Sequence, residues 1–448
     1  MAKTNKPPGH DAFSLLSQLA RVQKDTPEFL CDCQRRFGDV TSLSLSSWQG
    51  YLICHPDDVR RVLQDNHHNY SKATIQYDQL SDITGRGLLT SQGDLWLAQR
   101  RLMQPAFNRP RLMALDRVIV PAVEQLGARW AQAAKAGENL NVDAEMMSLA
   151  LEIVGKALFS IDLSRDAPRL TRAVMTCLDA IVGRVRFPLR MPDFIPTPGR
   201  LHFAAALNTL DMTLYNMVAE RRASRDPGDD LLAMLLNARD ETGRGMDDVQ
   251  LRDELMTILV AGHETVASAL TWTWYLLAKN PGAYDRLRQE AQNVLSGRAP
   301  ASTDLEHLNY SSAVFSEALR LYPPAWVITR RALAEDKLGG YAIPPGSTLI
   351  ISPYVMHRLD SAWERPLDFS PERFLDGKKA PQFAYIPFGA GPHLCIGAGF
   401  ARVEAQIILS MLAQQFRLEL LRPAQAVKAE ALVTLRPKGG LWMRPIPL

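Results

Sequence analysis

The longest apolar stretch of the chain runs from residue 248 to about residue 280, where a Pro-Gly pair follows. Acidic residues precede it, and these signals together predict one continuous helix of about 50 Å. His263 and Glu264 stand at its centre. They argue against a membrane span, because polar side chains are costly in a bilayer. We therefore expect a buried central helix in a large helical domain.

Other stretches show helical or alternating patterns. Apolar residues with helical spacing predict two helices over residues 112–158 and one helix directly after Cys395. Alternation of apolar and polar residues over 40–54 predicts a hairpin that turns at Gln49-Gly50.

The remaining patterns are shorter or less regular. Short β-rich runs predict strands over residues 327–353, and a final hairpin is expected over 432–443. Residues 72–91 lack a clean period and contain two glycines, which favours a loop folded over a pocket. The proline-rich residues 187–203 favour an apolar loop between two helices. These patterns predict a mainly α fold with a smaller β region. No linker or repeat divides the chain, so we expect a single domain over residues 1–448.

Composition narrows the class of protein. The chain is 46% hydrophobic and 22% charged, which is typical of a globular protein with a large core. A net charge of +3 without a basic run argues against nucleic acid as a partner. Five scattered cysteines favour a reducing compartment over a disulfide framework. The first twenty residues lack the apolar core of a signal peptide or a transmembrane anchor, so we expect a cytoplasmic protein.

Cys395 has the most informative surroundings, FGAGPHLCIGAGFA. Gly391 and Gly397 permit unusual dihedral angles and a close backbone approach. The predicted helix that follows would favour a thiolate at its N-terminus. Phe388 would cover the sulfur side of a flat ring, so the loop is suited to a thiolate ligand of haem iron. The alternative is that Cys395 is a small buried hydrophobe, as many unpaired cysteines are.

The sequence AGHET, at residues 261–265, interrupts the central helix with polar side chains. Thr265 can donate to the Ala261 carbonyl or release it, which would open a groove for oxygen and water. Glu264 can relay protons, with a pKa perturbed by burial. Both residues are therefore candidate catalytic groups. The alternative is a helix kink whose glutamate reaches solvent or an arginine.

Two further pairs have the spacing of helix neighbours. Trp96 and Arg100 lie one turn apart, where an indole N–H and a guanidinium would hold a haem propionate. Glu317 and Arg320 form an i,i+3 pair that would join Arg373 in a buried network beneath the cysteine loop. The alternative for the first pair is a surface helix with an incidental tryptophan and arginine. The alternative for the second is an exposed ion pair.

Taken together, these motifs resemble the cytochrome P-450 superfamily. FGAGPHLCIG resembles its haem-thiolate loop, AGHET its oxygen-activating helix, EALR with PERF its structural network, and WLAQR its propionate-binding helix. The resemblance implies a triangular single domain with a buried haem b. It also implies an axial Cys395 and a proton-delivery pair of Glu264 and Thr265. The residues that it implies as contacts of the cofactor are Trp96, Arg100, Ala261, Arg330, Phe388, His393 and Gly397.

Two departures from the family pattern matter. His393 stands where many members have arginine, an exchange that still supplies a donor, and Val266 replaces a frequent hydroxyl residue. A narrower resemblance, in AGHETVASALTW and EALRLYPPAWVITRR, is to soluble bacterial enzymes of the thermophilic β-carotene 3-hydroxylase type. It implies a pocket for a long apolar polyene, unless these residues are simply core. The implied wall residues are Ile75, Tyr77, Leu80, Leu88, Leu89, Val266, Trp326, Val327, Ile328 and Val433.

The resemblance implies a monomeric monooxygenase that inserts one oxygen atom of O2 into a C–H bond of a hydrophobic substrate. The first candidate reaction is hydroxylation of a carotenoid ring. The sequence contains no flavin or iron-sulfur segment, so a ferredoxin and its reductase would supply electrons. The alternatives are a fatty-acid or terpenoid hydroxylase, including a peroxide-driven one, and a haem-thiolate sensor or carrier without turnover.

Overall fold

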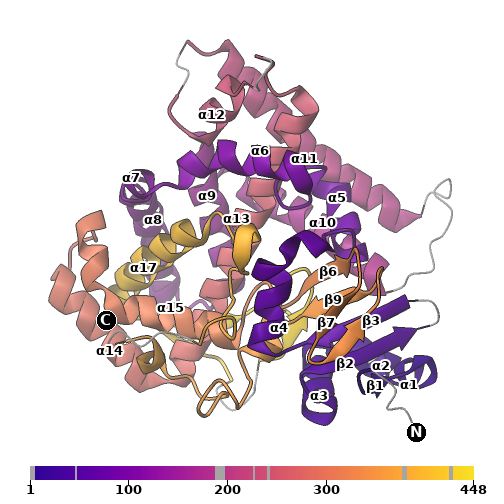
Figure 1. The fold of residues 1–448 in the computed structure, drawn as a ribbon. Helices are drawn as coiled ribbons and strands as arrows, with labels where there is room; N and C mark the ends of the chain where they lie inside the picture. Colours follow the sequence, from indigo (N-terminus) through magenta and orange to yellow (C-terminus); the bar gives the residue numbers. More distant parts are fainter. Residues whose placement is uncertain are drawn as a thin grey trace, which may run out of the picture. The chain divides into compact units, whose positions relative to one another are not determined.

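The computed structural model describes residues 6–45, 48–186, 197–225, 228–239, 243–375, 381–422 and 427–448 (Figure 1). Its contacts divide the chain into two compact units. Unit 1 comprises Met1–Asp78, Leu319–Phe369 and Asp376–Cys395, and unit 2 comprises Gln79–Ala318, Ser370–Leu375 and Ile396–Leu448. Each unit is therefore assembled from segments that lie far apart in the sequence.

Unit 1 is built around a mixed sheet of six strands. Their order is β1-β2-β3-β9-β6-β4, so strands from the N-terminal eighty residues pair with strands from residues 328–351 (Figure 1). The strands are β1 (Gly9–His10), β2 (Val40–Leu45), β3 (Trp48–Ile53), β4 (Tyr70–Ser71), β6 (Ile328–Ala332) and β9 (Thr348–Ile351). The helices of this unit are α1 (Ala12–Ser17), α2 (Leu19–Lys24), α3 (Thr26–Phe37), α4 (Pro56–Arg60) and α16 (Pro353–Met356). A separate pair, β7 (Asp336–Leu338) and β8 (Tyr341–Ile343), completes it.

The predicted hairpin over residues 40–54 is confirmed, but its turn is not at Gln49-Gly50. Both residues lie inside β3, where Gly50 pairs with Leu43. A Cβ atom at Gly50 would overlap the ring of Trp48. The glycine therefore makes room for an aromatic ring within a strand, which its usual preference for turns does not reveal.

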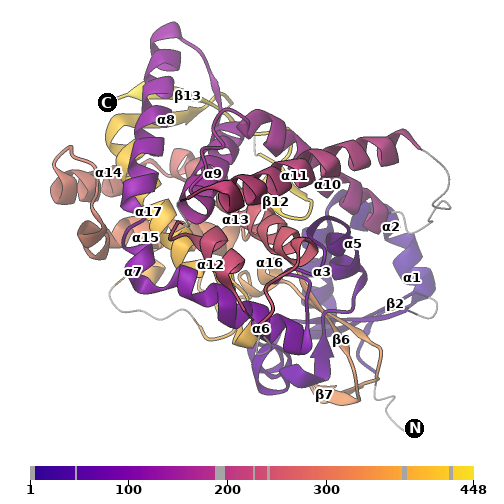
Figure 2. The same cartoon turned by 90° about the horizontal axis from the view of Figure 1, so that it is seen from above.

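Unit 2 is a helical assembly around α13 (Asp248–Lys279), whose 32 residues confirm the predicted central helix. Asp247 caps its N-terminus by accepting a hydrogen bond from the Gln250 amide at 2.7 Å. Helices α9 (Val142–Phe159) and α11 (Pro198–Ala223) pack against it (Figure 2). Because helices cover it on several sides, α13 is apolar around most of its circumference.

The other helices of unit 2 include α6 (Gly93–Met103), α8 (Asp116–Ala136), α10 (Ala167–Arg186), α12 (Leu231–Asn237), α14 (Pro281–Leu295) and α17 (Ala398–Gln415). Helices α8 and α9 confirm the two helices expected over residues 112–158, and α17 confirms the one expected after Cys395. Helix α5 (Ile75–Thr84) and helix α15 (Asn309–Leu321) each begin in one unit and end in the other.

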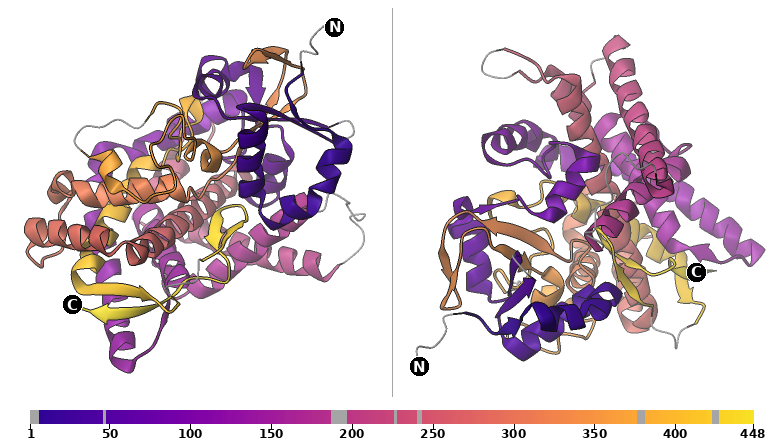
Figure 3. Two further views of the ribbon diagram at one scale, coloured as in Figure 1. Left: turned by 90° about the horizontal axis from the view of Figure 1, so that it is seen from below. Right: turned by 90° about the vertical axis from the view of Figure 1, so that its right-hand side faces the viewer.

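The C-terminal strands differ from the prediction. The hairpin expected over residues 432–443 is wrong, because β12 (Leu435–Pro437) pairs with β11 (Ala429–Ala431) instead. Strand β13 (Trp442–Pro447) pairs with β10 (Phe416–Leu420) and β5 (Leu140–Asn141), close to the C-terminus (Figure 3). β12 forms a local hairpin with the preceding β11, and β13 pairs with the more distant β10 and β5, so the turn signal at the two glycines between β12 and β13 does not produce a hairpin.

Residues 72–91 were expected to form a loop, but α5 occupies residues 75–84 of this segment. Its helical period is hard to see because polar residues share its buried face: Gln79 and Thr84 are buried beside Leu80 and Ile83. The proline-rich residues 187–196 lie outside the described part of the chain. Across the described ranges, no helix has the length and apolar character needed to cross a membrane.

Candidate active site

The cysteine loop, residues 388–395, belongs to unit 1 and exposes its sulfur-bearing residue. Cys395 is exposed, whereas the other four cysteines are buried. Its amide donates to the Phe388 carbonyl at 2.9 Å, and the Leu394 amide donates to the Gly391 carbonyl at 3.0 Å. These two bonds close the loop on itself, so the position of Cys395 is set by backbone hydrogen bonds rather than by packing of its side chain.

The glycines of the loop have different roles. Gly391 has a φ of +68°, and a Cβ there would overlap the Leu63 carbonyl oxygen, so only glycine fits. Gly389 also has a positive φ, of +74°. Gly397 does not follow the expectation for its dihedral angles. Its φ is −86°, which any residue adopts, and it serves as the N-cap of α17.

A buried arginine and a buried histidine support the segment that precedes the loop. Arg320 is fully buried and donates to the carbonyls of His357 at 2.8 Å, Pro366 at 2.6 Å and Asp368 at 2.9 Å. The His357 Nε2 atom accepts the Ile386 amide at 2.9 Å. Its Nδ1 atom therefore carries the proton and donates to the Arg320 carbonyl at 3.1 Å.

The other members of the predicted network lie in unit 2. Glu317 is fully buried, accepts the Ser370 amide at 2.9 Å, and pairs with the Arg373 Nε atom at 3.3 Å. Arg286 and Tyr310 both reach Glu372, next to Arg373, at 2.8 Å and 3.3 Å. Glu317 therefore ties helix α15 to the PERF segment, as a buried carboxylate with charged and backbone donors.

The central turn of α13, residues 261–265, is the place where this helix is open. Between residues 251 and 277, only Ala261, Gly262 and Thr265 are not buried. The Thr265 hydroxyl donates to the Ala261 carbonyl at 2.7 Å. A Cβ at Gly262 would lie 3.0 Å from Val154 Cγ2, so this glycine makes room for α9 and not only for a ligand. Ala261 and Thr265, four residues apart, form an accessible strip on an otherwise buried helix.

Glu264 lies in the same turn but faces the interior of unit 2. It is 1% exposed, and its Oε1 atom accepts the hydroxyl of Thr434 at 2.8 Å. Burial raises the pKa of Glu264 to about 7, although Arg436 and the Thr434 hydrogen bond act in the opposite direction. A carboxyl group with that pKa exchanges its proton readily at neutral pH.

Two buried cations lie together in unit 1. Arg330 and Lys72 are each 6% exposed, and both contact the Tyr77 ring, at 5.9 Å and 5.8 Å. Arg330 also donates to the Tyr77 hydroxyl at 3.1 Å. Burial and then the nearby Arg330 charge lower the pKa of Lys72 to about 7. The sequence analysis did not single out Lys72, whose only signal was its place at the start of the segment over residues 72–91.

Helix α6 carries the other predicted propionate contacts. Trp96 and Arg100 are both half-buried and lie one helical turn apart, as expected. The remaining predicted contacts, Phe388 and His393 in the cysteine loop and Gly397 after it, are also half-buried. All of these residues keep surface that a ligand could cover.

The predicted pocket residues fall into three groups by exposure. Ile75 is exposed at 48%, so its side chain points to solvent or to an open space. The fully enclosed residues are Leu80, Leu88, Val266 and Trp326. The half-buried residues are Tyr77, Leu89, Val327, Ile328 and Val433. The half-buried group retains the accessible apolar surface that a hydrophobic substrate requires.

Two acidic side chains of α13 anchor residues 85–91. Asp253 Oδ2 accepts the Arg86 amide at 2.7 Å, and Glu254 Oε2 accepts the Leu88 amide at 3.0 Å. Burial raises the pKa of Glu254 to about 8. Gly85 has a φ of +55°, and a Cβ there would overlap the Asp253 carboxylate. This close approach fixes the segment that carries Leu88 and Leu89.

A Gly85→Ala variant tests this anchor against a matched control. Gly93 has a similar φ of +59°, but a Cβ there would meet no atom within 4 Å. We expect Gly93→Ala to cost about 1–2 kcal/mol, the price of an L residue in left-handed backbone. Gly85→Ala should cost a further ~1–3 kcal/mol, because Asp253 must move and lose its bond to Arg86. Urea unfolding measures the free energy of unfolding of both variants. Equal losses in the two would contradict the proposal that the close approach of Gly85 to Asp253 anchors residues 85–91.

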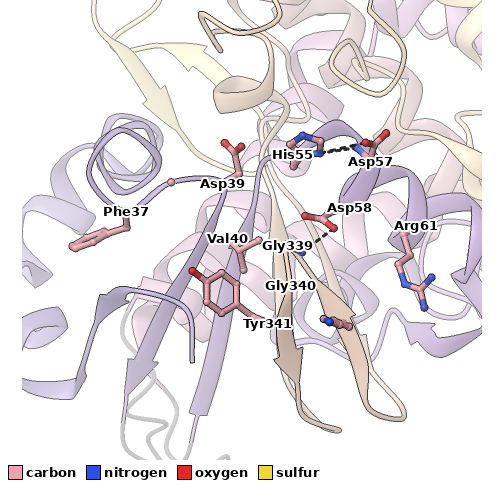
Figure 4. A pocket seen from close by; sticks show the side chains of 12 residues that line it. Phe37, Asp39, Val40, His55, Asp57, Asp58, Arg61, Gly339, Gly340 and Tyr341 are labelled. Atoms are coloured by element: carbon pink, nitrogen blue, oxygen red, sulfur yellow. Dashed lines mark hydrogen bonds and ion pairs between the residues drawn. The ribbon is translucent and has the colours of Figure 1, made fainter. Parts of the chain in front are cut away.

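A surface hollow of about 770 Å³ in unit 1 has a different character (Figure 4). Its lining includes Asp39, Asp57 and Asp58, and the Asp58 carboxylate accepts the Gly339 amide at 3.1 Å. None of the residues that line it is a predicted site residue. A hollow with three carboxylates is unsuited to an apolar substrate.

The residues present fit a thiolate-ligated haem. Unit 1 supplies an exposed cysteine in a loop held by backbone hydrogen bonds, and a buried pair of cations that suits a carboxylate. Unit 2 supplies an accessible strip on α13 with a buried acid beside it. The donor chemistry therefore matches a group that has one thiolate ligand and acidic substituents.

Comparison with known proteins agrees with this chemistry. The family model described as Cytochrome P450 matches residues 5–443. The chain is 37% identical to "Cyclooctatin synthase" of Streptomyces melanosporofaciens, over 91% of this chain and 88% of that protein. It is 32% identical to "Carotene epsilon-monooxygenase, chloroplastic" of Arabidopsis thaliana, over 91% of this chain and 79% of that protein.

A solved structure gives the same result for the fold. The crystal structure of CYP175A1 from Thermus thermophillus superposes with a TM-score of 0.80 at 32% identity, and covers 98% of this chain and 99% of that one. The resemblance found in the motifs and the mainly α fold class are confirmed. The chain therefore belongs to the cytochrome P450 family, and it is a haem-iron monooxygenase.

Proposed function

We propose that the protein inserts one oxygen atom of O2 into a ring C–H bond of a carotenoid. The observation that carries this proposal is the half-buried apolar surface of Leu89, Val327, Ile328 and Val433. An extended polyene has no polar group to pair, so apolar side chains that retain accessible surface suit it. The name of the Arabidopsis relative, a carotene monooxygenase, supports the same substrate class.

The cofactor in this proposal is haem b, and the Cys395 thiolate would hold its iron. The residues proposed to contact it are Trp96, Arg100, Ala261, Arg330, Phe388, His393 and Gly397. Bound there, the group would supply the iron redox chemistry that activates O2. Arg100, Arg330 and His393 would hold its propionates, and the buried Lys72 adds positive charge beside Arg330.

Glu264 and Thr265 form the proton-delivery pair of this proposal. The Thr265 hydroxyl donates to the Ala261 carbonyl at 2.7 Å, and release of that bond would free it to donate a proton to another acceptor, such as water. Glu264 holds a proton that it can give up near neutral pH, because burial raises its pKa to about 7.

The partners of this proposal follow the family expectation. A ferredoxin and its reductase would supply the two electrons that the insertion of one oxygen atom from O2 requires. We further propose a cytoplasmic monomer in which residues 1–448 form one catalytic domain. The match of the family model to residues 5–443 supports the domain assignment.

A terpenoid hydrocarbon is the second candidate substrate. The names of two Streptomyces relatives favour it: "Cyclooctatin synthase" at 37% identity, and "Pentalenene oxygenase" of Streptomyces avermitilis at 33% identity over 89% of this chain and 88% of that protein. The same half-buried apolar residues suit a compact hydrocarbon.

A titration of the ferric haem spin state separates the candidates. We expect β-carotene to produce the high-spin shift, because a bound apolar substrate would exclude water from the haem site. Ile328→Trp should abolish the shift, because a larger ring at this half-buried position would compete with the substrate, whereas Leu333→Trp should not, since Leu333 is 58% exposed beyond the end of β6. A shift with pentalenene alone would favour the terpenoid, and a shift with a fatty acid alone would contradict both. Turnover with peroxide but not with a ferredoxin system would contradict the proposal that a ferredoxin and its reductase supply the electrons.

A further inference from the structure

A second hollow lies in unit 2, and none of the residues that line it is a proposed contact of the cofactor or the substrate. Its volume is about 490 Å³, and helices α9 and α10 and the β11–β12 hairpin line it. The lining contains charges of both signs: Asp143, Asp179, Glu430 and Arg436. Water therefore suits this hollow better than an apolar molecule.

The β11–β12 hairpin connects this hollow with Glu264. Thr434, in the hairpin turn, donates to Glu264 at 2.8 Å. The next carbonyl, that of Leu435, accepts from Ser268 Oγ at 2.7 Å and from Trp272 Nε1 at 2.8 Å. Glu264, Ser268 and Trp272 occur at four-residue steps and share one face of α13. Three side-chain hydrogen bonds therefore fix the hairpin against the turn that carries the acid.

Arg436 forms the inner wall of the hollow, two residues beyond Thr434. Its Nη2 atom pairs with Asp143 Oδ2 at 2.5 Å, and its Nη1 atom contacts the Met175 sulfur at 2.7 Å. The side chain is only 13% exposed. Its position is thus set by two helices, α9 and α10, and its charge stays close enough to Glu264 to lower that pKa.

The charged groups that act on Glu264 come from three elements. Arg436 of β12 favours the carboxylate, and Asp179 of α10 and Asp143 of α9 favour the protonated form. His263, the neighbour on α13, is fully buried, and burial lowers its pKa to about 4, so it is neutral. All three charged groups line the hollow, which makes its walls the electrostatic surroundings of the acid.

We propose that this hollow is the entrance through which bulk water returns protons to Glu264, and that Thr434 and Arg436 are positioning residues for that acid. The proposal rests on the proton role of Glu264 proposed above. When Glu264 has given up its proton, a hydronium ion from the hollow transfers one to a carboxylate oxygen. An O–H bond forms on the carboxyl group, and a neutral water molecule remains.

The first experiment measures the acid directly in the haem-loaded protein. Infrared difference spectra show the protonated carboxyl band of Glu264, assigned by its loss in Glu264→Gln. In the wild type the band should titrate near pH 7. The midpoint should rise in Arg436→Met and fall in Asp179→Asn. Thr434→Val should raise it and shift the band frequency, and Thr434→Ser should restore both. Unchanged midpoints in Arg436→Met and Thr434→Val would overturn the positioning roles.

The second experiment tests the entrance with a matched pair of glycines. Gly183 lines the hollow on α10, and Gly199 lies on α11 outside it; a Cβ at either position meets no atom within 4 Å. After mixing with D2O, the Glu264 band should shift more slowly in Gly183→Trp than in the wild type. Gly199→Trp should exchange at the wild-type rate. Equal exchange rates in both variants would overturn the proposal that this hollow is the entrance for protons.

Neither experiment requires turnover, so the inference and the proposed function can fail separately. If the Glu264→Gln variant still couples electron use to hydroxylated product, the proposed proton role of Glu264 is refuted. The infrared results on the wild type would not be affected. Slow exchange in Gly183→Trp together with reduced coupling of electron use to product would support both. Normal coupling with slow exchange would show that reprotonation through this hollow does not serve catalysis, which overturns the proposal.

Discussion

Replacement of Cys395 by serine should remove the absorption band of the ferrous carbon monoxide complex after which the family is named. The band depends on a thiolate ligand, and a hydroxyl group is a much weaker donor to iron. Cys395 is exposed in a loop held by its own backbone, so the substitution should leave the fold of unit 1 intact. Monooxygenase activity should fall to background.

The neighbouring Leu394 provides the matched control. It is 43% exposed, and Leu394→Ser makes a comparable change of polarity one residue away. This variant should keep the carbon monoxide band and most of the activity. A normal band in Cys395→Ser would refute the assignment of the axial ligand. No other cysteine is a ready substitute, because Cys31, Cys33, Cys54 and Cys177 are buried.

The elements that local patterns specify were predicted well. Helix α13 has acidic residues at its start, a Pro-Gly stop and a long apolar interior, and each signal is local in sequence. The same holds for α17, which follows the glycine-rich loop. The position of Gly50 was misassigned because a glycine beside Trp48 and a glycine in a turn look alike until the ring position is known.

The contacts that define the site depend on tertiary structure and could not be predicted in the same way. Thr434 reaches Glu264 across 170 positions of the chain, and Arg436 reaches Asp143 across 293. No periodicity relates such pairs. One partial signal existed: Ser268 and Trp272 follow Glu264 at four-residue steps, which is unusual polar spacing for an apolar helix. That spacing indicates a polar partner on this face without naming it.

Burial also changes what a motif means. Taken alone, EALR reads as an exposed ion pair, but Glu317 and Arg320 are both fully buried. Their partners are backbone groups as well as charges, since Arg320 donates to three carbonyls and Glu317 accepts the Ser370 amide. The cost of losing either side chain is therefore larger than for a surface pair.

We expect Arg320→Met to be the most destabilising of the substitutions considered. It leaves the buried carbonyl oxygen of His357 and the partly buried carbonyl oxygens of Pro366 and Asp368 without their donor. It also removes the cation that lies 5.2 Å from the Trp363 ring centroid. Loss of a buried charged partner costs about 3–5 kcal/mol, which is a large part of the total stability of a typical protein. Urea unfolding of the haem-loaded protein measures the loss.

The effect should extend to the cysteine loop, because the same network reaches it. His357 receives the Arg320 hydrogen bond on its carbonyl and holds the Ile386 amide with its ring, two residues before Phe388. Arg320→Met should therefore weaken haem retention as well as stability, and Arg320→Lys should recover only part of each, since an ammonium group cannot reproduce the planar guanidinium fork. Arg169→Met is the control: this arginine is 60% exposed in a surface pair, so its loss should cost less than about 1 kcal/mol. Equal losses in Arg320→Met and Arg169→Met would show that these three carbonyls find other donors, and that the arginine is not what supports the loop.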